Sequence, residues 1–452
     1  MALFLLRRHF ATKSRSTIPT LYPLDPSSTS PSATFQLLSW GRGASGQLGD
    51  PLERDLRPYP SAVASFSLPL NSFHLSPTPG RLPSPPPAAI ATGEAQAQAS
   101  ASVQLGISCG LFHSAIVVDG KVWIWGKGDG GRLGFGDEVS QFVPRLNPNL
   151  EGIESVALGG LHSAALSRSG EVFTWGYGGF GALGHSVYHR ELHPRRVDGS
   201  WSGKVSHLAT SGAHTAAVTD SGEVYTWGRD EGDGRLGLGA GGGPGEAGSM
   251  SVPSKVDALP VPVSAVACGG FFTMAITPDG ELWSWGANSN FELGRGNNTS
   301  DWRPKPVSIL QNTRIIQVAC GGYHSLALSD DGKVYAWGHG GQGQLGQPTM
   351  QNQRVPVVIE ALSAEKIVFI ACGGSSSAAV SDAGKLFMWG NARDSQLGVP
   401  QLQDIQPVPV EVKFLTDNDE MGPHRVISCA IGASHAMCLV SRQPQMTLGK
   451  FL

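Results

Sequence analysis

The chain has 452 residues, enough for two or three ordinary domains, with 33 basic and 36 acidic residues and a formal net charge of −3. This slightly acidic balance argues against a broad phosphate-binding surface, although it leaves room for one local basic face. The six cysteines include no Cys-x-x-Cys pair, so we expect small buried thiols in a reducing compartment, no metal site and no cofactor.

The first 34 residues are expected to lie outside the folded body. Residues 1–20 contain four basic residues and no acidic residue, and they are rich in Ser and Thr, which is typical of an organelle transit peptide. The apolar run at residues 2–6 is too short to cross a bilayer, so no membrane span is predicted. The mitochondrion is the favoured destination and the chloroplast the alternative. Residues 21–34 are rich in Pro and Ser and are interpreted as a linker.

A repeated Trp-Gly pair organises the rest of the chain. Successive pairs are 85, 50, 52, 58, 52 and 52 residues apart, and a Leu-Gly pair follows each Trp eight or nine residues later. A period near 52 residues with short strands is typical of a propeller blade. Because a buried Trp removes about 150–250 Å² of surface from water, we interpret these residues as anchors between blades rather than as a ligand cage. The seven anchors are Trp40, Trp125, Trp175, Trp227, Trp285, Trp337 and Trp389.

The unit from Cys320 to Gly346 shows how one repeat is built. A Gly-Gly step leads into an alternating run that starts at His324. Asp331-Gly332 then predicts a two-residue type I′ hairpin turn, because Gly tolerates positive φ. A second alternating run ends at Trp337, and a Gly-rich loop closes on Leu345-Gly346. The unit therefore reads as a β-hairpin with a loop over one end.

One repeat unit is divided between the two ends of the chain. The first Trp-Gly pair, at Trp40, lacks the preceding Gly-Gly and His half, and that half appears at residues 431–435 without a Trp-Gly pair after it. If the two halves share one sheet, the ring closes and no strand edge is exposed at the seam. The sequence thus predicts an all-β, seven-bladed β-propeller over residues 35–440, closed by pairing of N- and C-terminal strands in one blade, with residues 441–452 as a tail.

An irregular stretch interrupts the repeats after the first Trp-Gly pair. From Pro60 to Cys109 the chain runs 49 residues, whereas the equivalent stretch from Pro356 to Cys372 takes 16. The extra residues, at about 68–102, are rich in Pro, Ala and Gln and have few apolar side chains to pack. We predict a disordered surface loop there, with a partner-docking segment as the alternative.

Two repeated features look catalytic but are assigned structural roles. Four of the loops match Gly-x-Gly-x-x-Gly, yet none opens a helix in a βαβ unit, as dinucleotide binding requires. A catalytic His is normally single and paired with a nucleophile or an acid, so a His that repeats with the blade indicates a structural hydrogen bond. No catalytic residue is therefore predicted. The repeated residues are His113, His162, His214, His324 and His435, with Phe272 and Ser376 in the other two units.

The densest basic cluster in the body lies in residues 188–196. We consider Arg190, His193, Arg195 and Arg196 a candidate contact for a partner or for RNA, since they could bind phosphates or an acidic surface. The alternative is a solvated loop with no ligand.

The repeated GG-x-H-S…DG-x-V-x-x-WG…G-x-LG pattern resembles the regulator-of-chromosome-condensation repeat family, over about residues 35–66 and 103–440. The resemblance implies a seven-bladed propeller closed by its two termini. Members include a nuclear exchange factor for a Ras-like GTPase, a plant ultraviolet-B photoreceptor and organelle-targeted proteins. The photoreceptor's Gly-Trp-Arg-His-Thr motif is replaced here by Gly-Gly-Tyr-His-Ser at residues 321–325, so light sensing is not expected.

The transit peptide and the family resemblance together give the expected function. The chain is predicted to be a non-enzymatic mitochondrial propeller adaptor that binds protein partners on one face. The similar plant proteins imply support of organelle RNA processing, in particular transcript splicing, and of respiratory complex I biogenesis, within an RNA-processing complex. The alternative is a guanine-nucleotide exchange factor whose partner is a small GTPase of the organelle. Direct RNA binding through Arg190–Arg196 is a third hypothesis.

Overall fold

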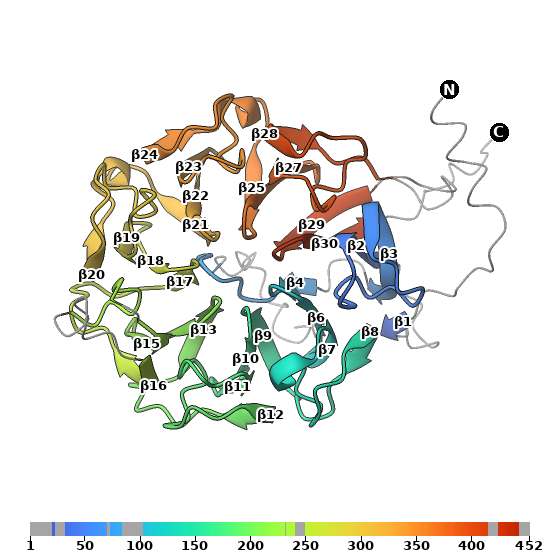
Figure 1. The fold of residues 1–452 in the computed structure, drawn as a ribbon, viewed down its shortest axis with the longest axis horizontal. Coiled ribbons are helices and arrows are strands. Elements are labelled where there is room, and N and C mark those ends of the chain that lie inside the picture. Colours follow the sequence, from blue (N-terminus) through green and yellow to red (C-terminus); the bar gives the residue numbers. More distant parts are fainter. Residues whose placement is uncertain are drawn as a thin grey trace, which may run out of the picture.

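The computed structural model describes residues 20–22, 32–69, 73–83, 103–230, 232–239, 249–414 and 424–442. Seven β-sheets stand around a central axis like the blades of a propeller (Figure 1), which confirms the predicted fold class. In six of the blades the four main strands follow one another in chain order from the axis to the rim, and each is antiparallel to the next. Three single-turn 3-10 helices are described: η2 (Asp129–Gly131), η3 (Ser308–Leu310) and η4 (Glu360–Leu362).

Blades two to seven each take their four main strands from one continuous stretch of chain. Blade two contains β5 (Val103–Cys109), β6 (His113–Val118), β7 (Lys121–Gly126) and β8 (Gln141–Leu146). Blade three contains β9 (Ile153–Leu158), β10 (His162–Ser167), β11 (Val172–Gly176) and β12 (Glu191–Arg196). Blade four contains β13 (Val205–Thr210), β14 (His214–Thr219), β15 (Val224–Arg229) and β16 (Ser249–Lys255).

The remaining three of these blades repeat the same order. Blade five contains β17 (Ala265–Cys268), β18 (Phe272–Ile276), β19 (Leu282–Gly286) and β20 (Asp301–Pro306). Blade six contains β21 (Ile315–Cys320), β22 (His324–Ser329), β23 (Val334–Gly338) and β24 (Gln353–Val358). Blade seven contains β25 (Ile367–Cys372), β26 (Ser376–Ser381), β27 (Leu386–Asn391) and β28 (Ile405–Glu411).

Blade one, which we call the closing blade, is built from both ends of the chain. Its order is β1-β3-β2-β30-β29, and the blue N-terminal strands lie beside the red C-terminal ones in Figure 1. β2 pairs antiparallel with β30 in a register that places Leu37 opposite Leu439. The predicted closure of the ring by terminal strands is therefore confirmed. The bounds are β1 (Thr20–Tyr22), β2 (Ser32–Arg42), β3 (Leu56–Pro69), β29 (His424–Ile431) and β30 (His435–Arg442).

The predicted boundaries of the body need correction at both ends. β1 runs from the last residue of the predicted transit peptide into the stretch interpreted as a linker. It pairs in parallel with β3, and Leu21 packs on the core beside the closing blade. β2 begins at Ser32 and β30 continues to Arg442, so both strands extend beyond residues 35–440. The rest of the predicted transit peptide and tail, residues 1–19 and 443–452, lies outside the described residues.

The hairpin turn predicted at Asp331-Gly332 has a different form. Gly332 has a φ of +88°, but its N–H donates to the Ser329 carbonyl, so the turn starts at Ser329, one residue before the start that a type I′ turn would have. This is a three-residue loop ending in a left-handed Gly, and the Ser329 hydroxyl accepts a hydrogen bond from the Lys333 N–H. Both central residues of the Asp119-Gly120 turn have positive φ, so the type I′ form occurs there instead.

The described residues form seven hydrophobic clusters, each between two neighbouring blades. The second strand of a blade, such as β22, is buried along its whole length because another blade covers each of its faces. Such strands read as nearly continuous runs of small and apolar residues, whereas the rim strands are partly exposed. The core therefore stabilises the interfaces between blades.

The predicted disordered insertion is partly wrong. Within it, β4 (Phe73–Leu75) pairs in parallel with β5, and the chain then crosses the end of the axial opening as far as Leu82 (Figure 1). Leu82 packs on the core between blades five and six, although the insertion has few apolar residues overall. Main-chain hydrogen bonds to the inner strands hold this part of the insertion in place despite its few apolar side chains. Residues 70–72 and 84–102 lie outside the described residues.

Candidate interaction face

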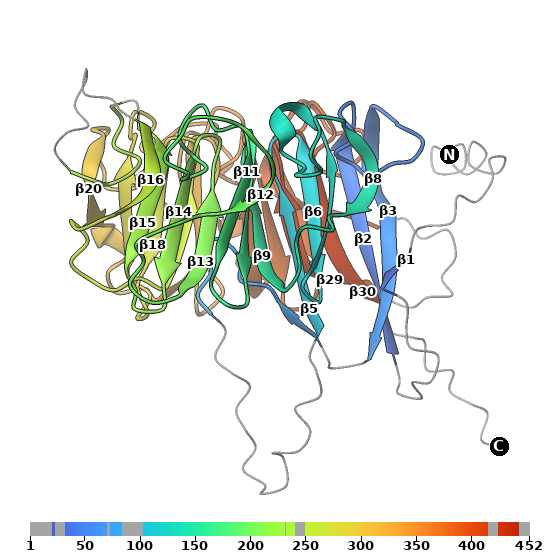
Figure 2. The same cartoon turned by 90° about the horizontal axis from the view of Figure 1, so that it is seen from below.

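Two sets of loops gather on one face of the ring, which we call the loop face. In each blade the first strand ends in the small turn before His or its replacement, and the third strand ends at Trp-Gly. Because neighbouring strands are antiparallel, both ends reach the same side, where η2 is visible at the upper edge of Figure 2. The turns between second and third strands lie on the opposite side, which we call the hairpin face.

All seven sequence-predicted Trp residues are completely buried between blades. The indole N–H of Trp389, for example, donates to the main-chain carbonyl of Gln344 in the preceding blade over 2.9 Å. Gln344 precedes Leu345-Gly346, and a Cβ on Gly346 would lie 3.0 Å from the indole nitrogen. The Leu-Gly pair of one blade is thus shaped to receive the Trp of the next.

The same contact recurs around the ring, including the seam. Trp40 of the closing blade donates to the Gln396 carbonyl of blade seven over 2.8 Å, across 356 positions of sequence. Trp227 is the exception, because its buried Nε1 has no hydrogen-bond partner among the described residues. The other pairs are Trp125 with Gln47, Trp175 with Arg132, Trp285 with Arg235 and Trp337 with Glu292.

The five repeated histidines also join neighbouring blades, which confirms the hydrogen-bonded role predicted for them. His324 Nε2 lies 2.8 Å from the Ser377 hydroxyl, which itself donates to the Gln344 carbonyl. Because the Ser377 hydroxyl proton is used in that bond, the neutral His324 ring donates from Nε2 to the hydroxyl oxygen. The other pairs are His113 with Ser163, His162 with Thr215, His214 with Thr273 and His435 with Ser114.

Burial keeps these histidines neutral. Desolvation lowers the pKa of His324 and of His435 to about 3, and desolvation together with nearby Arg132 lowers the pKa of His162 to about 4. The pKa values of His113 and His214 lie well below the ordinary value for the same reason, with further depression by neighbouring cationic groups. A neutral imidazole can make the hydrogen bond to the hydroxyl of the neighbouring blade, whereas a charged imidazole would be buried without a counterion.

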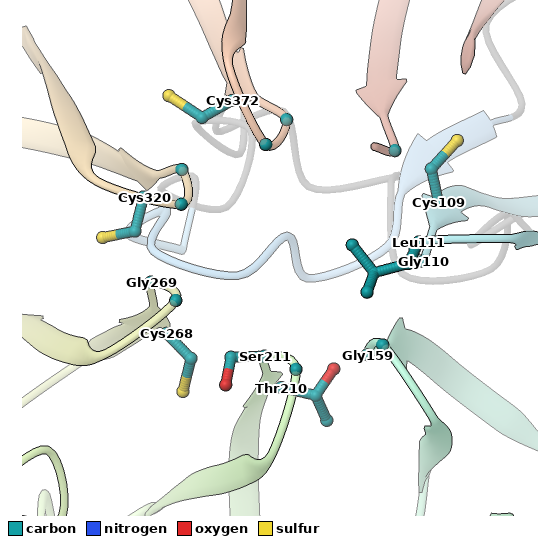
Figure 3. Close-up of a pocket in the computed structure, with 18 of the residues that line it drawn as sticks. Cys109, Gly110, Leu111, Gly159, Thr210, Ser211, Cys268, Gly269, Cys320 and Cys372 are labelled. Carbon is teal, nitrogen blue, oxygen red and sulfur yellow. The ribbon is translucent and has the colours of Figure 1, made fainter. Parts of the chain in front are cut away.

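At the centre of the loop face the seven turns surround a cavity of about 160 Å³ (Figure 3). Cys109, Cys268, Cys320 and Cys372 line it at equivalent places, with their sulfur atoms turned away from its centre. Burial raises the pKa of each of these thiols, which keeps them protonated and poorly nucleophilic. All six cysteines are free.

Large apolar side chains stand beside this mouth. Three aromatic residues, Phe112, Phe271 and Tyr323, adjoin the glycines of the turns, and Leu111 lies next to Phe112 in the chain. We call these four residues the aromatic rim. Tyr323 is 44% exposed and stacks on Phe271 with ring centroids 5.4 Å apart. Lys127 lies over the Phe112 ring and Arg235 over the Phe271 ring. Aromatic residues combined with cations are typical of the energetic centres of protein interfaces.

None of the rim residues was singled out from the sequence. A signal is present, since the residue after the small turn is Phe112, Phe271 or Tyr323 in three blades and Ser375 or Ser434 in two others. The sequence alone does not say that this position points to solvent beside an axial mouth.

The predicted basic cluster lies on the rim of blade three, in β12 and the loop before it. Its arginines are exposed and paired with carboxylates: Arg190 with Glu138, Arg195 with Glu191, and Arg196 with Glu171 and Asp198. His193 Nδ1 lies 3.4 Å from the Asn149 side-chain nitrogen. The local charge is thus largely balanced, and contact with RNA or a partner through these residues stays a prediction.

The described residues hold no group of three or more His, Cys, Asp or Glu side chains arranged to bind a metal ion. Within the same ranges, no helix has the length and apolar character needed to cross a bilayer.

The fold, the blade repeat and the loop face define an RCC1-like propeller. The chain belongs to the RCC1-like domain family, whose family model matches residues 36–438. This is the family that the repeat motif resembles.

Two curated relatives and one solved structure illustrate the relationship. The chain is 62% identical to the Arabidopsis thaliana RCC1 domain-containing protein RUG3, mitochondrial, over 94% of this chain and 93% of that protein. It is 34% identical to the ultraviolet-B receptor UVR8 of the same plant, over 76% of each chain. The crystal structure of human WBSCR16 superposes with a TM-score of 0.70 at 25% identity, covering 90% of this chain and 98% of that one.

Proposed function

We propose that this protein is a mitochondrial propeller adaptor that binds protein partners on its loop face. The observation that carries the proposal is the aromatic rim, in which Phe112 and Tyr323 remain exposed beside the axial mouth. Lys127 lies over the Phe112 ring and Arg235 over the Phe271 ring. Exposed aromatic side chains that cluster with cations beside a concave mouth are typical of protein interaction sites.

The mitochondrial location rests on two supports. The first 20 residues have the composition of a transit peptide, and the similar Arabidopsis protein bears the word mitochondrial in its name. Fusion of the full chain to a fluorescent protein, beside a fusion lacking residues 1–19, tests the location. Retention of the shortened fusion in mitochondria would contradict the role given to the leader.

The biological role that we propose is support of organelle transcript splicing and respiratory complex I biogenesis. It rests on the family resemblance rather than on a particular residue. Affinity purification of the tagged chain from mitochondria should recover RNA-processing or complex I assembly factors. Recovery of neither class would overturn this biological role, but it would not contradict the propeller fold or the proposal that partners bind on the loop face.

The loop face itself is tested by Phe112→Ala combined with Tyr323→Ala. A suitable control is Val143→Ala on the rim strand β8, because Val143 is 41% exposed and Tyr323 is 44% exposed. We expect the double variant to lose its recovered partners by at least about tenfold, as for loss of an interface centre, and the control to keep them. Equal recovery by both variants would show that partners bind elsewhere.

A guanine-nucleotide exchange factor for a small GTPase of the organelle is the second candidate. It is favoured by the match of residues 36–438 to the RCC1-like domain family. Release of labelled guanine nucleotide from candidate GTPases separates the two proposals. Acceleration by the wild type but not by the double rim variant would favour exchange, whereas a flat trace for every GTPase would leave the adaptor.

A further inference from the structure

A segment of the chain crosses the hairpin-face end of the axial channel. We call Ser76–Leu82 the strap; it appears in Figure 1 as the blue trace running from β4 towards β17 and β21. At its start, the Ser76 N–H donates to the Leu105 carbonyl of blade two over 2.7 Å. Near its end, the Leu82 N–H donates to the Ile316 carbonyl of blade six over 2.9 Å.

The middle of the strap is bound by blade four. His207 Nε2 donates to the Thr78 carbonyl over 2.9 Å, and His207 Nδ1 accepts from the Val266 N–H of blade five over 3.3 Å. Burial lowers the pKa of His207 to about 4, so the ring is neutral near pH 7 and both nitrogens are used. One buried side chain thus connects the strap with two blades.

Gly80 is fixed between blades five and six. Its N–H donates to the Val266 carbonyl and its own carbonyl accepts from the Val318 N–H, each over 2.8 Å. Its φ is +72°, and a Cβ would lie 2.1 Å from the Val318 carbonyl oxygen. Only glycine fits this position, because any side chain would collide with main-chain atoms.

Arg81 extends the contact to blade seven. Its Nη1 donates to the Gln317 side-chain oxygen over 3.0 Å and to the Val368 carbonyl over 2.8 Å, and its guanidinium lies over the Phe369 ring. Gln317 also donates to the Ile370 carbonyl of blade seven. The strap therefore lies on a bridge that already joins two blades.

We propose that the strap is a clasp formed within the chain, which ties blades four to seven to blade two across the axis and closes the channel at the hairpin face. In a ring where blades contact only their neighbours, opening one interface leaves the others intact. A tie across the axis changes this, because separating blade two from blades four to seven also breaks the bonds of the strap. The ring is then held by the strap as well as by the shared sheet of the closing blade.

Hydrogen exchange on the full chain tests the clasp. In the wild type we expect the amides of Ser76, Gly80, Leu82 and Val318 to be protected, since each donates to a main-chain carbonyl. Gly80→Ala should raise exchange across residues 76–82 and 315–320 by at least about tenfold and lower the Tm. Exchange of the wild-type strap at the rate of a free peptide would overturn the proposal.

Gly152→Ala is a matched control. Gly152 has a φ of +64° but no atom within 4 Å of a Cβ, so this variant carries the backbone strain without the collision. We expect Gly80→Ala to lower the Tm clearly more than the control does. Equal effects of the two variants would mean that the strap contributes nothing beyond its backbone conformation, and would also overturn the clasp.

A second experiment supplies the strap separately. Residues 73–83 are replaced by a Gly-Ser linker, and a synthetic peptide of residues 73–83 is added. We expect the peptide to bind and to restore protection at residues 315–320, and the same peptide with Gly80→Val not to bind. Absence of peptide binding by a folded replacement chain with unchanged Tm would contradict the proposal. If that chain does not fold, the proposal is judged by the amide hydrogen exchange of the strap in the wild-type protein.

Discussion

Asp50 and Arg57 form a buried ion pair in the closing blade, with 2.9 Å between Arg57 Nη2 and Asp50 Oδ2. Blade five has the same pair with the charges exchanged, because Arg295 and Asp301 occupy the equivalent positions and lie 2.8 Å apart. In both blades one partner follows the Leu-Gly pair, and the other is paired across the sheet with the Gly of Trp-Gly. In these two blades the position therefore accepts the ion pair in either orientation.

This exchange predicts how the closing blade responds to mutation. Arg57→Ala should lower the free energy of unfolding by about 3–5 kcal/mol, because it removes the buried cation and leaves the buried Asp50 carboxylate with only the exposed Arg54 nearby. Arg54→Ala is the control, since Arg54 is 44% exposed and 3.5 Å from Asp50, and should cost less than about 1 kcal/mol. Urea unfolding measures both. The double variant Asp50→Arg/Arg57→Asp should recover most of the loss; no recovery would contradict the equivalence.

The Trp ring allows a matched pair of substitutions. Trp337→Phe removes a buried indole that donates to the Glu292 carbonyl, whereas Trp227→Phe removes an indole whose Nε1 has no hydrogen-bond partner in the described part of the chain. Both variants lose volume, but only the first leaves a carbonyl with one donor fewer. We therefore expect Trp337→Phe to be more destabilising by about 1 kcal/mol. Thermal unfolding gives the difference, and an equal loss would show that packing alone matters.

Stability should fall on mild acidification. The buried histidines have folded pKa values of about 3 to 4, below the unfolded value near 6.5. The unfolded chain therefore binds more protons in this window, and the stabilisation, complete above about pH 6.5, is lost progressively as the pH falls towards 4. For His162 alone the full loss is about 3 kcal/mol.

The Tm measured between pH 7.5 and 4.5 checks this expectation. Asp230 acts in the opposite sense, because burial and nearby Asp233 raise its pKa to about 6, but it is one group against several histidines. His324→Phe copies blade five, where Phe272 occupies the position, and should flatten the pH dependence. An unchanged pH profile in that variant would contradict the assignment.

The basic cluster on blade three leads to a prediction about RNA. Because Arg195 and Arg196 are already paired with Glu191 and Glu171, we expect Arg195→Glu/Arg196→Glu to change RNA retention by no more than about twofold. Filter binding of the full chain at low and physiological salt measures the change. A loss above tenfold would instead support direct RNA contact at this strand.

The count of blades and the closure of the ring could be read from the sequence. Each Trp-Gly and Leu-Gly pair is a local signature, and the half unit at residues 431–435 indicated a shared blade. The turn at Asp331-Gly332 was predicted in the wrong form, because Ser329 competes for its main-chain hydrogen bonds. That competition depends on a side chain outside the Asp-Gly pair.

The sequence by itself determined the seven-fold repeat and the buried character of the Trp residues, because the same local pattern recurs about every 52 residues. It also determined the joining of the two ends, because each end carries one half of that pattern. The tertiary structure alone decided that Leu-Gly of one blade receives the Trp of the next, that the strap crosses the axis, and that aromatic side chains from three blades stand beside the mouth. These features join residues far apart in the chain, such as Arg81 and Gln317 at 236 positions, where no local pattern specifies the partner.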